Sequence, residues 1–378
     1  MDDGNHAATD LWSQIFARAA EHPNASLMDP DYDPSADDAR ARTGFALAGW
    51  TAEDIDRILS AAVDRKSSAP MTSPGVNPSA EAFHGALCDD VEREMARQGL
   101  VSQRNVARGI EPRTGPFASK TGVIMTDESI ITVGAFTYRF CGIVAKAFFR
   151  TIVLAPHYWQ SDGFTTAGAN MLLRRNMPAA MYWNRIFMSF SMSGTHSTIP
   201  FEPSNSEDVW HVEQIARAME LFIVAHEYGH HHLGHGRNIE ADPRAEEFAA
   251  DQFALRLCRP IGHADRTPKW NPYLASGAGG VIILKALEIV RRFETALGEP
   301  TANDATHPKV DERIARFDSV AVIEPQAFLM LKGFRLASSR VMEAVGALMD
   351  DFLSAIPAES LTKLRAMRES VWQELPRV

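Results

Sequence analysis

Apolar residues recur at the spacing of an amphipathic helix through most of the chain. The clearest run lies between about residues 209 and 233, where Ile215, Met219 and Phe222 fall on one helical face and charged residues separate them. Runs of the same period and helix-start signals predict further helices at about 9–22, 51–65, 80–98, 281–297, 325–354 and 358–374. The chain is therefore expected to be predominantly helical.

A different pattern lies in the first half of the chain. Residues 123–125 and 130–133 are short apolar runs on either side of a polar turn, which predicts two β-strands. The apolar segment 140–154 fits either a buried helix or a buried strand, because a continuous apolar run has no distinguishing period. The combination predicts an α+β fold with a small β-sheet and a helical C-terminal half.

One stretch has the composition of a linker. Residues 67–79 are rich in proline, glycine and serine, which favour turns and extended chain. We expect a boundary there, which separates an N-terminal helical and linker region, 1–78, from a main domain, 79–378. The 378 residues are enough for a large core in that main domain.

Charge and composition narrow the possible partners and compartments. The formal net charge of -10 argues against a nucleic-acid partner, because phosphate binding needs a basic surface. Three widely spaced cysteines suggest neither a disulfide framework nor a cysteine metal site, and each is expected to be a small buried residue. The N-terminus has no signal-type apolar core, and charged residues interrupt the most apolar segment, 279–290. A cytoplasmic protein without a membrane span is expected.

The strongest chemical signal lies inside the helix predicted at 209–233. His226, Glu227 and His230 form an HExxH motif, in which the two histidines are one helical turn apart on the same face. Two imidazoles placed in this way can bind one Zn²⁺ ion. Glu227 then lies beside the metal without being a ligand, where a general base is needed to activate water.

A catalytic zinc site uses three protein ligands, so a third ligand should be close in the sequence or in space. Asp242 followed by proline predicts the start of another helix, in which Glu247 and Asp251 are one turn apart and which is expected to end at Pro260. Glu247 can reach the metal while Asp251 orients a ligand histidine. Glu246 competes for the third position, but it lacks an acid four residues later.

HExxH followed by ExxxD resembles the gluzincin metallopeptidases, and this resemblance implies a zincin-like core with the small sheet beside the active-site helix. Residues 247–254, 306–308 and 312–314 resemble short motifs of the CAAX-prenyl-protease and HtpX-like peptidases in particular. The connection between the two main motifs is short for that family, and membrane helices are missing. A soluble HtpX-like peptidase or a Lit-type phage-exclusion peptidase is therefore the expected relative.

The resemblance also suggests a group that stabilises the oxyanion. His307 is the leading candidate for this catalytic role, with Arg313 and Tyr228 behind it. The alternative for His307 is a residue that simply precedes a helix.

The histidines that follow the motif raise a rival assignment. A metzincin would need glycine at 233 and histidine at 236, whereas the chain has Leu233 and Gly236. The metzincin assignment therefore fails. His231, His232 and His235 remain alternative metal ligands, but solvated residues near a helix end are the expectation for each.

Together these observations predict a zinc-dependent endopeptidase that acts on a protein or peptide substrate. Extra segments on both sides of the motif region favour narrow specificity or a regulated enzyme. The alternative is a catalytically silent regulatory or binding module of the same fold. Nothing in the sequence indicates the oligomeric state.

Overall fold

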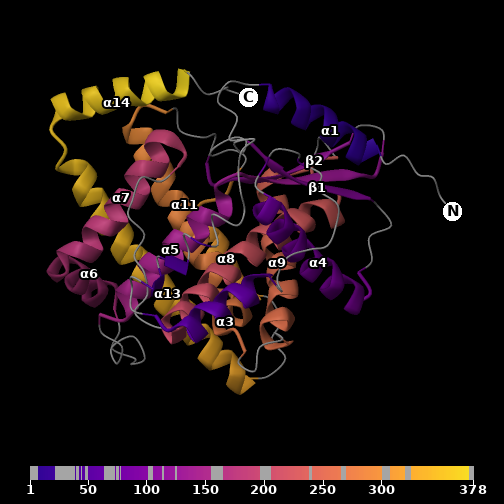
Figure 1. Cartoon of the computed structure of the whole chain (residues 1–378), viewed down its shortest axis with the longest axis horizontal. Helices are drawn as coiled ribbons and strands as arrows, with labels where there is room; N and C mark the ends of the chain where they lie inside the picture. The colour runs from indigo at the N-terminus through magenta and orange to yellow at the C-terminus, as the bar shows by residue number, and fades with distance from the viewer. Residues whose placement is uncertain are drawn as a thin grey trace.

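The computed structural model describes residues 7–21, 39, 42–43, 45–46, 50–63, 73, 76, 78–100, 105–112, 115–123, 126–154, 165–195, 206–237, 241–264, 270–299, 307–319 and 325–373. These residues form a mainly helical body with a small three-stranded sheet on one side (Figure 1). The prediction of a predominantly helical α+β fold is confirmed.

Most of the helices that the apolar period predicts are present, with ends that differ by about three residues or less. The segment 140–154, which the sequence left open, is a helix. The helices are α1 Ala7–Ala20, α3 Ala52–Val63, α4 Pro78–Arg97, α5 Thr137–Ile152, α6 Thr166–Arg175, α7 Met177–Ser193, α8 Ser206–His232, α9 Pro243–Ala264, α10 Pro272–Ser276, α11 Ala278–Ala296, α12 Val310–Ala315, α13 Pro325–Ser354 and α14 Ala358–Gln373, with a 3₁₀ turn at Arg316–Ser319.

The expectation that Pro260 ends its helix is wrong, since α9 continues to Ala264. A proline inside a helix removes the N–H that would bond to the carbonyl four residues earlier. That carbonyl belongs to Arg256, and it accepts a hydrogen bond from Gln98 Nε2 at 3.2 Å. A partner from outside the helix thus satisfies the acceptor that Pro260 leaves open.

The sheet contains one strand that the sequence pattern did not predict. Its strands are β1 Val106–Glu111, β2 Ala118–Gly122 and β3 Ser129–Gly134, in the order β1-β3-β2. β1 runs parallel to β3, and β2 runs antiparallel to it. A strand was expected at 123–125, but β2 lies earlier in the sequence and ends at Gly122. Residues 124 and 125 lie outside the described part of the chain. β2 occupies the edge that lies against α8.

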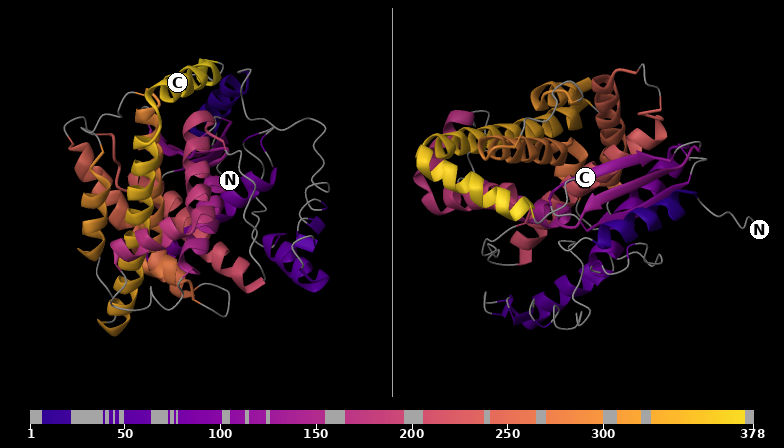
Figure 2. Two further views of the ribbon diagram at one scale, coloured as in Figure 1. Left: turned by 90° about the vertical axis from the view of Figure 1, so that its left-hand side faces the viewer. Right: turned by 90° about the horizontal axis from the view of Figure 1, so that it is seen from above.

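The N-terminal helix covers the sheet. Trp12 and Phe16 of α1 share an apolar cluster with Ile110 of β1 and with Ile130 and Val133 of β3. Figure 2 shows α1 alongside the sheet, away from the large helical body. The boundary at residue 78 stays a prediction, although α1 packs on strands that follow it in the sequence.

Helix α8 lies at the centre of the helical body (Figure 1). It packs against α4, α5, α9, α10 and α11, and its apolar face belongs to the main core. The three cysteines are buried and free, as the sequence predicts. Within the described part of the chain, no helix is long and apolar enough to cross a membrane.

The replacement Gly279→Ala is expected to destabilise the contact between α8 and α11. A Cβ atom at position 279 would lie 2.4 Å from the carbonyl carbon and oxygen of Ala218, and backbone atoms cannot move aside as a flexible side chain can. Overpacking of this kind costs about 1–3 kcal/mol of the free energy of unfolding. Urea denaturation measures the loss. The control Gly333→Ala, which meets nothing within 4 Å, should be neutral or stabilising.

Candidate active site

The HExxH residues lie on the face of α8 that borders a large cavity. His226 and His230 are one turn apart, and their Nε2 atoms are 3.0 Å from each other. Glu227 lines the same cavity and is almost completely buried. The helical period thus places two imidazoles and one carboxylate at the same wall.

Helix α9 brings a second carboxylate to these histidines. Glu247 Oε2 lies 3.6 Å from His226 Nε2, and its Oε1 lies 3.5 Å from His230 Nε2. The two helices approach closely because Gly229 has no side chain. A Cβ atom there would lie 3.0 Å from Ala250 Cα and 3.1 Å from its carbonyl oxygen.

These three side chains fit a zinc ion. Each offers one ligand atom, and the three atoms lie within 4.8 Å of one another. Two ligands that are each about 2.1 Å from a tetrahedral centre lie roughly 3.4 Å apart, close to the three distances above. Two imidazoles and one carboxylate also make up a known ligand set of catalytic zinc, which leaves one position for water. His226, His230 and Glu247 therefore form a possible metal site whose donor set suits Zn²⁺.

Asp251 stands behind one of the histidines. Its Oδ1 lies 3.0 Å from His226 Nδ1, a buried atom, although the pair lacks the alignment of a hydrogen bond. Arg313 donates two hydrogen bonds to Asp251, of 2.7 and 2.6 Å, and its Nη1 lies 3.2 Å from Glu247 Oε2. Burial raises the pKa of Asp251, but the bonds from Arg313 outweigh this effect and hold that pKa below its ordinary value. The carboxylate is therefore charged and placed to orient His226.

His235 stands behind the other histidine, and the sequence did not single it out for this place. Its Nδ1 lies 2.9 Å from His230 Nδ1, so the Nε2 atom of His230 faces the candidate metal position. The carbonyl oxygen of His235 accepts a hydrogen bond from Lys120 of β2 at 2.8 Å. The expectation of a solvated residue does not hold for His235, because the turn after α8 folds it back onto the site.

The same expectation is wrong for His231 and incomplete for His232. His231 is fully buried, with Nδ1 2.9 Å from Ser129 Oγ at the start of β3. His232 stacks on Phe253, with ring centres 5.0 Å apart. Both residues lie on faces of α8 that pack against other elements. Because histidine is polar, the hydrophobic pattern of the sequence did not mark these two positions as buried.

The replacement His235→Ala is expected to weaken zinc binding about ten- to a hundredfold, the usual effect of losing the partner of a ligand histidine. His235→Asn should recover most of the affinity, since an amide places a polar atom near the position of Nδ1. Competition with a chromophoric chelator measures the zinc affinity. His232→Asn is the matched control and should leave it unchanged. Equal affinities for all three variants would contradict a positioning role for His235.

Glu227 has the environment of a general base. Burial raises its pKa above the ordinary value, while His226 and His230 act in the opposite direction. By contrast, His230, His307 and Arg313 hold the pKa of Glu247 well below its ordinary range against the effect of burial. The two carboxylates are therefore differentiated: Glu247 stays ionised as a ligand should, and Glu227 binds a proton more readily.

The three candidates for an oxyanion donor are placed very differently. His307 lines the cavity, is 45% exposed and has Nδ1 3.4 Å from Glu247 Oε1. Arg313 also lines the cavity, but its donors face Asp251 and Glu247. Tyr228 is buried on the opposite side of α8, where its hydroxyl donates to Glu92 at 2.5 Å. Of these three candidates, only His307 has an exposed ring close to the candidate ligands.

Glu246 also lines the cavity, but its carboxylate is bound to the turn that follows α8. Its two carboxylate oxygens accept hydrogen bonds of 3.0 and 3.1 Å from the backbone N–H of Gly236. This contact ties the start of α9 to the turn that carries His235. The Glu246 side chain therefore supports the turn after α8 and is not one of the candidate ligands.

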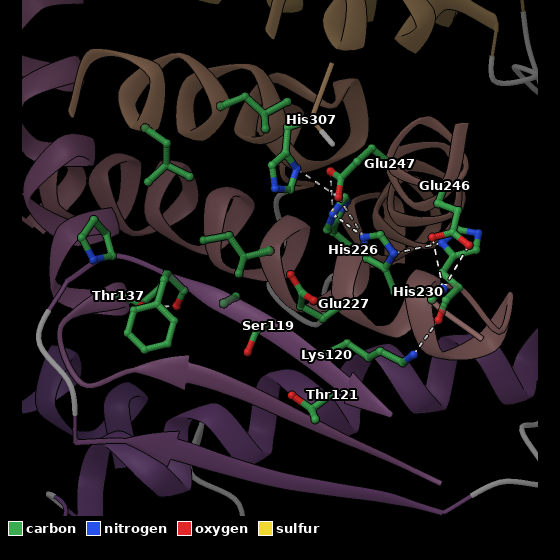
Figure 3. Close-up of a pocket in the computed structure, with 18 of the residues that line it drawn as sticks. Ser119, Lys120, Thr121, Thr137, His226, Glu227, His230, Glu246, Glu247 and His307 are labelled. Atoms are coloured by element: carbon green, nitrogen blue, oxygen red, sulfur yellow. Dashed lines mark hydrogen bonds and ion pairs between the residues drawn. The ribbon is translucent and has the colours of Figure 1, made fainter. Parts of the chain in front are cut away.

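The cavity has a volume of about 1220 Å³. Figure 3 shows His226, His230, Glu247 and His307 on one side and residues Ser119, Lys120 and Thr121 of β2 opposite, with Glu227 between them. Side chains of α11 line a further wall. The sheet that the sequence predicted beside the active-site helix thus forms one side of the cavity.

A comparison with family models finds a match to part of the chain. Residues 193–329 match the model of peptidase U49, the Lit-type peptidase family. No curated protein and no solved structure matches the chain. The matched residues include α8, α9 and the segment with His307 and Arg313, and the match supports a peptidase.

Proposed function

We propose that the chain is a zinc-dependent endopeptidase of the gluzincin type. The observation that carries this proposal is the convergence of His226, His230 and Glu247 at the distances of a tetrahedral site, with Glu227 beside them. A structural zinc ion prefers four protein ligands, and the described residues provide three here. The match to peptidase U49 supports the same reaction class.

Zinc bound at this site would polarise the scissile carbonyl and lower the pKa of a water molecule. Glu227 takes the proton of the attacking water and then delivers it to the leaving amine, which its raised pKa favours. His307, whose ring is exposed to the cavity, donates a hydrogen bond to the developing oxyanion. Asp251 and His235 keep the two ligand imidazoles in place.

The edge strand β2 provides the natural platform for the substrate. It is the last strand in the order β1-β3-β2, and no strand of the described chain pairs with its other edge. An extended peptide can bind such an edge through main-chain hydrogen bonds. Because β2 and α11 form two walls of the cavity, we expect a substrate to enter as an extended segment between them. This arrangement supports restricted specificity.

Metal removal tests the proposal. Treatment with a chelator such as 1,10-phenanthroline should abolish cleavage of a mixed peptide library by the purified protein, and about one equivalent of Zn²⁺ should restore it. Mass spectrometry of the library before and after incubation measures the cleavage. Tight binding of one zinc ion without any cleaved peptide would instead support a silent binding module.

A further inference from the structure

The cavity continues along helix α11, beyond the candidate metal ligands His226, His230 and Glu247. Gly280 of α11 packs against Phe222, and the ring centre of Phe222 is 6.3 Å from that of His226. The first turns of α11 therefore lie near the candidate metal ligands. The α11 residues that line the cavity are Ile283, Leu284, Leu287, Val290, Arg291 and Glu294. Since a helix rises 1.5 Å per residue, Glu294 lies about 16 Å from Ile283 along the axis. The α11 wall thus begins apolar and ends in two charged residues.

Glu294 is a carboxylate at the far end of this wall. It is half-buried and lines the cavity, and within the described part of the chain its side chain makes no hydrogen bond and no ion pair. Burial raises its pKa, while Arg368 and Arg291 act in the opposite direction. Arg368 is already engaged, because it donates to Ser191 O at 2.7 Å and to Glu299 Oε2 at 2.5 Å.

Arg291, one turn before Glu294, does not supply the missing partner. It is exposed at the rim of the cavity, and no ion pair joins it to Glu294 in the structure. An exposed pair at this helical spacing would in any case contribute little to stability. A cation that enters the cavity would lie in a less solvated environment, where its interaction with a carboxylate is stronger.

We propose that Glu294 determines specificity by binding a lysine or arginine side chain of the substrate, about five residues from the scissile bond. This inference rests on the proposed peptidase function. An extended peptide advances about 3.3 Å per residue, so about five residues span the distance from the first turns of α11 to Glu294. The residues between would face the apolar part of the wall, formed by Ile283, Leu287 and Val290.

Peptide binding to the zinc-loaded Glu227→Gln protein tests the inference without turnover. The probes are fluorescein-labelled peptides of alanine and leucine, about ten residues long, each with one lysine, norleucine or glutamate at a varied position. At one position, the lysine peptide should bind at least about tenfold tighter than the glutamate peptide, as measured by fluorescence anisotropy. Adding Glu294→Lys should reverse this preference, and adding Glu294→Gln should remove it. Adding Glu288→Gln, on the same helix but outside the cavity, should leave it unchanged.

Equal binding of the three peptide series at every position would overturn the inference, as would a lysine preference that survives Glu294→Lys. Zinc content, measured for each variant, shows that the site is intact. Incubation of the wild-type protein with the same peptides separates the two proposals. Charge-dependent binding without zinc-dependent cleavage would refute the peptidase function, whereas cleavage without charge preference would refute the role of Glu294 alone.

Discussion

Replacement of Glu227 by glutamine is expected to abolish peptide hydrolysis while zinc binding stays intact. Glutamine has nearly the same shape, and the ligands His226, His230 and Glu247 are unchanged, so the metal should remain. The amide cannot accept the proton of the attacking water. Because a positioned general base contributes about 10²–10⁴-fold, the turnover number should fall by at least a hundredfold. Zinc content by mass spectrometry and the rate of peptide cleavage give the two readouts.

The control for this variant is Glu207→Gln, at the exposed start of the same helix. It removes the same charge from α8 far from the cavity, and it should retain full activity. Wild-type turnover in the Glu227→Gln protein would remove the assigned base. Loss of zinc from that protein would show that Glu227 belongs among the ligands instead.

Replacement of Glu247 by alanine should weaken zinc binding by more than the hundredfold that losing a partner of a ligand causes, because it removes a ligand outright. The same change leaves Arg313 and His307 without the carboxylate that they contact. Isothermal titration with Zn²⁺ measures the affinity, and circular dichroism verifies that the helices persist.

Glu246→Ala is the matched control, one residue earlier and turned about 100° round α9. It removes the acceptor of the Gly236 N–H but no candidate ligand, so zinc should still bind tightly. A strong loss in Glu246→Ala with no loss in Glu247→Ala would move the third ligand by one residue. The ExxxD assignment would then fail.

The central features of the candidate site were accessible from the sequence because they lie on regular helices. A period of 3.6 residues fixes the relation of His226 to His230 and of Glu247 to Asp251, whatever the rest of the fold does. The helix start at Asp242 could also be predicted from the sequence. In the structure, the Asp242 carboxylate accepts a hydrogen bond from the N–H of Arg244 at 3.0 Å, as expected of a residue that caps a helix. The apolar period likewise predicted α8, α11, α13 and α14 to within a few residues.

The features that the sequence did not provide depend on tertiary contacts. His235 reaches His230 only because the chain turns back after α8, where Gly234 and Gly236 have φ angles of 70° and 72°. Arg313 was a candidate oxyanion donor, but Asp251 and Glu247 attract its guanidinium.

The strand β1 and the cavity wall were missed for related reasons. β1, with the sequence VARGIE, mixes charged residues and glycine with apolar ones, so its alternation is weak. It forms a strand because it pairs in parallel with β3, whose residues lie more than twenty positions later in the sequence than their partners in β1. The wall formed by α11 follows from its packing against α8, which no local pattern specifies.

The most direct test of the central claim compares protein N-termini in cells that produce either the wild-type chain or the Glu227→Gln variant. Enrichment and mass spectrometry of N-terminal peptides would identify every new cleavage site. We expect a small set of new N-termini that appear with the wild-type protein and are absent with the variant. Identical sets of N-termini in the two cell populations would contradict a peptidase that acts through Glu227.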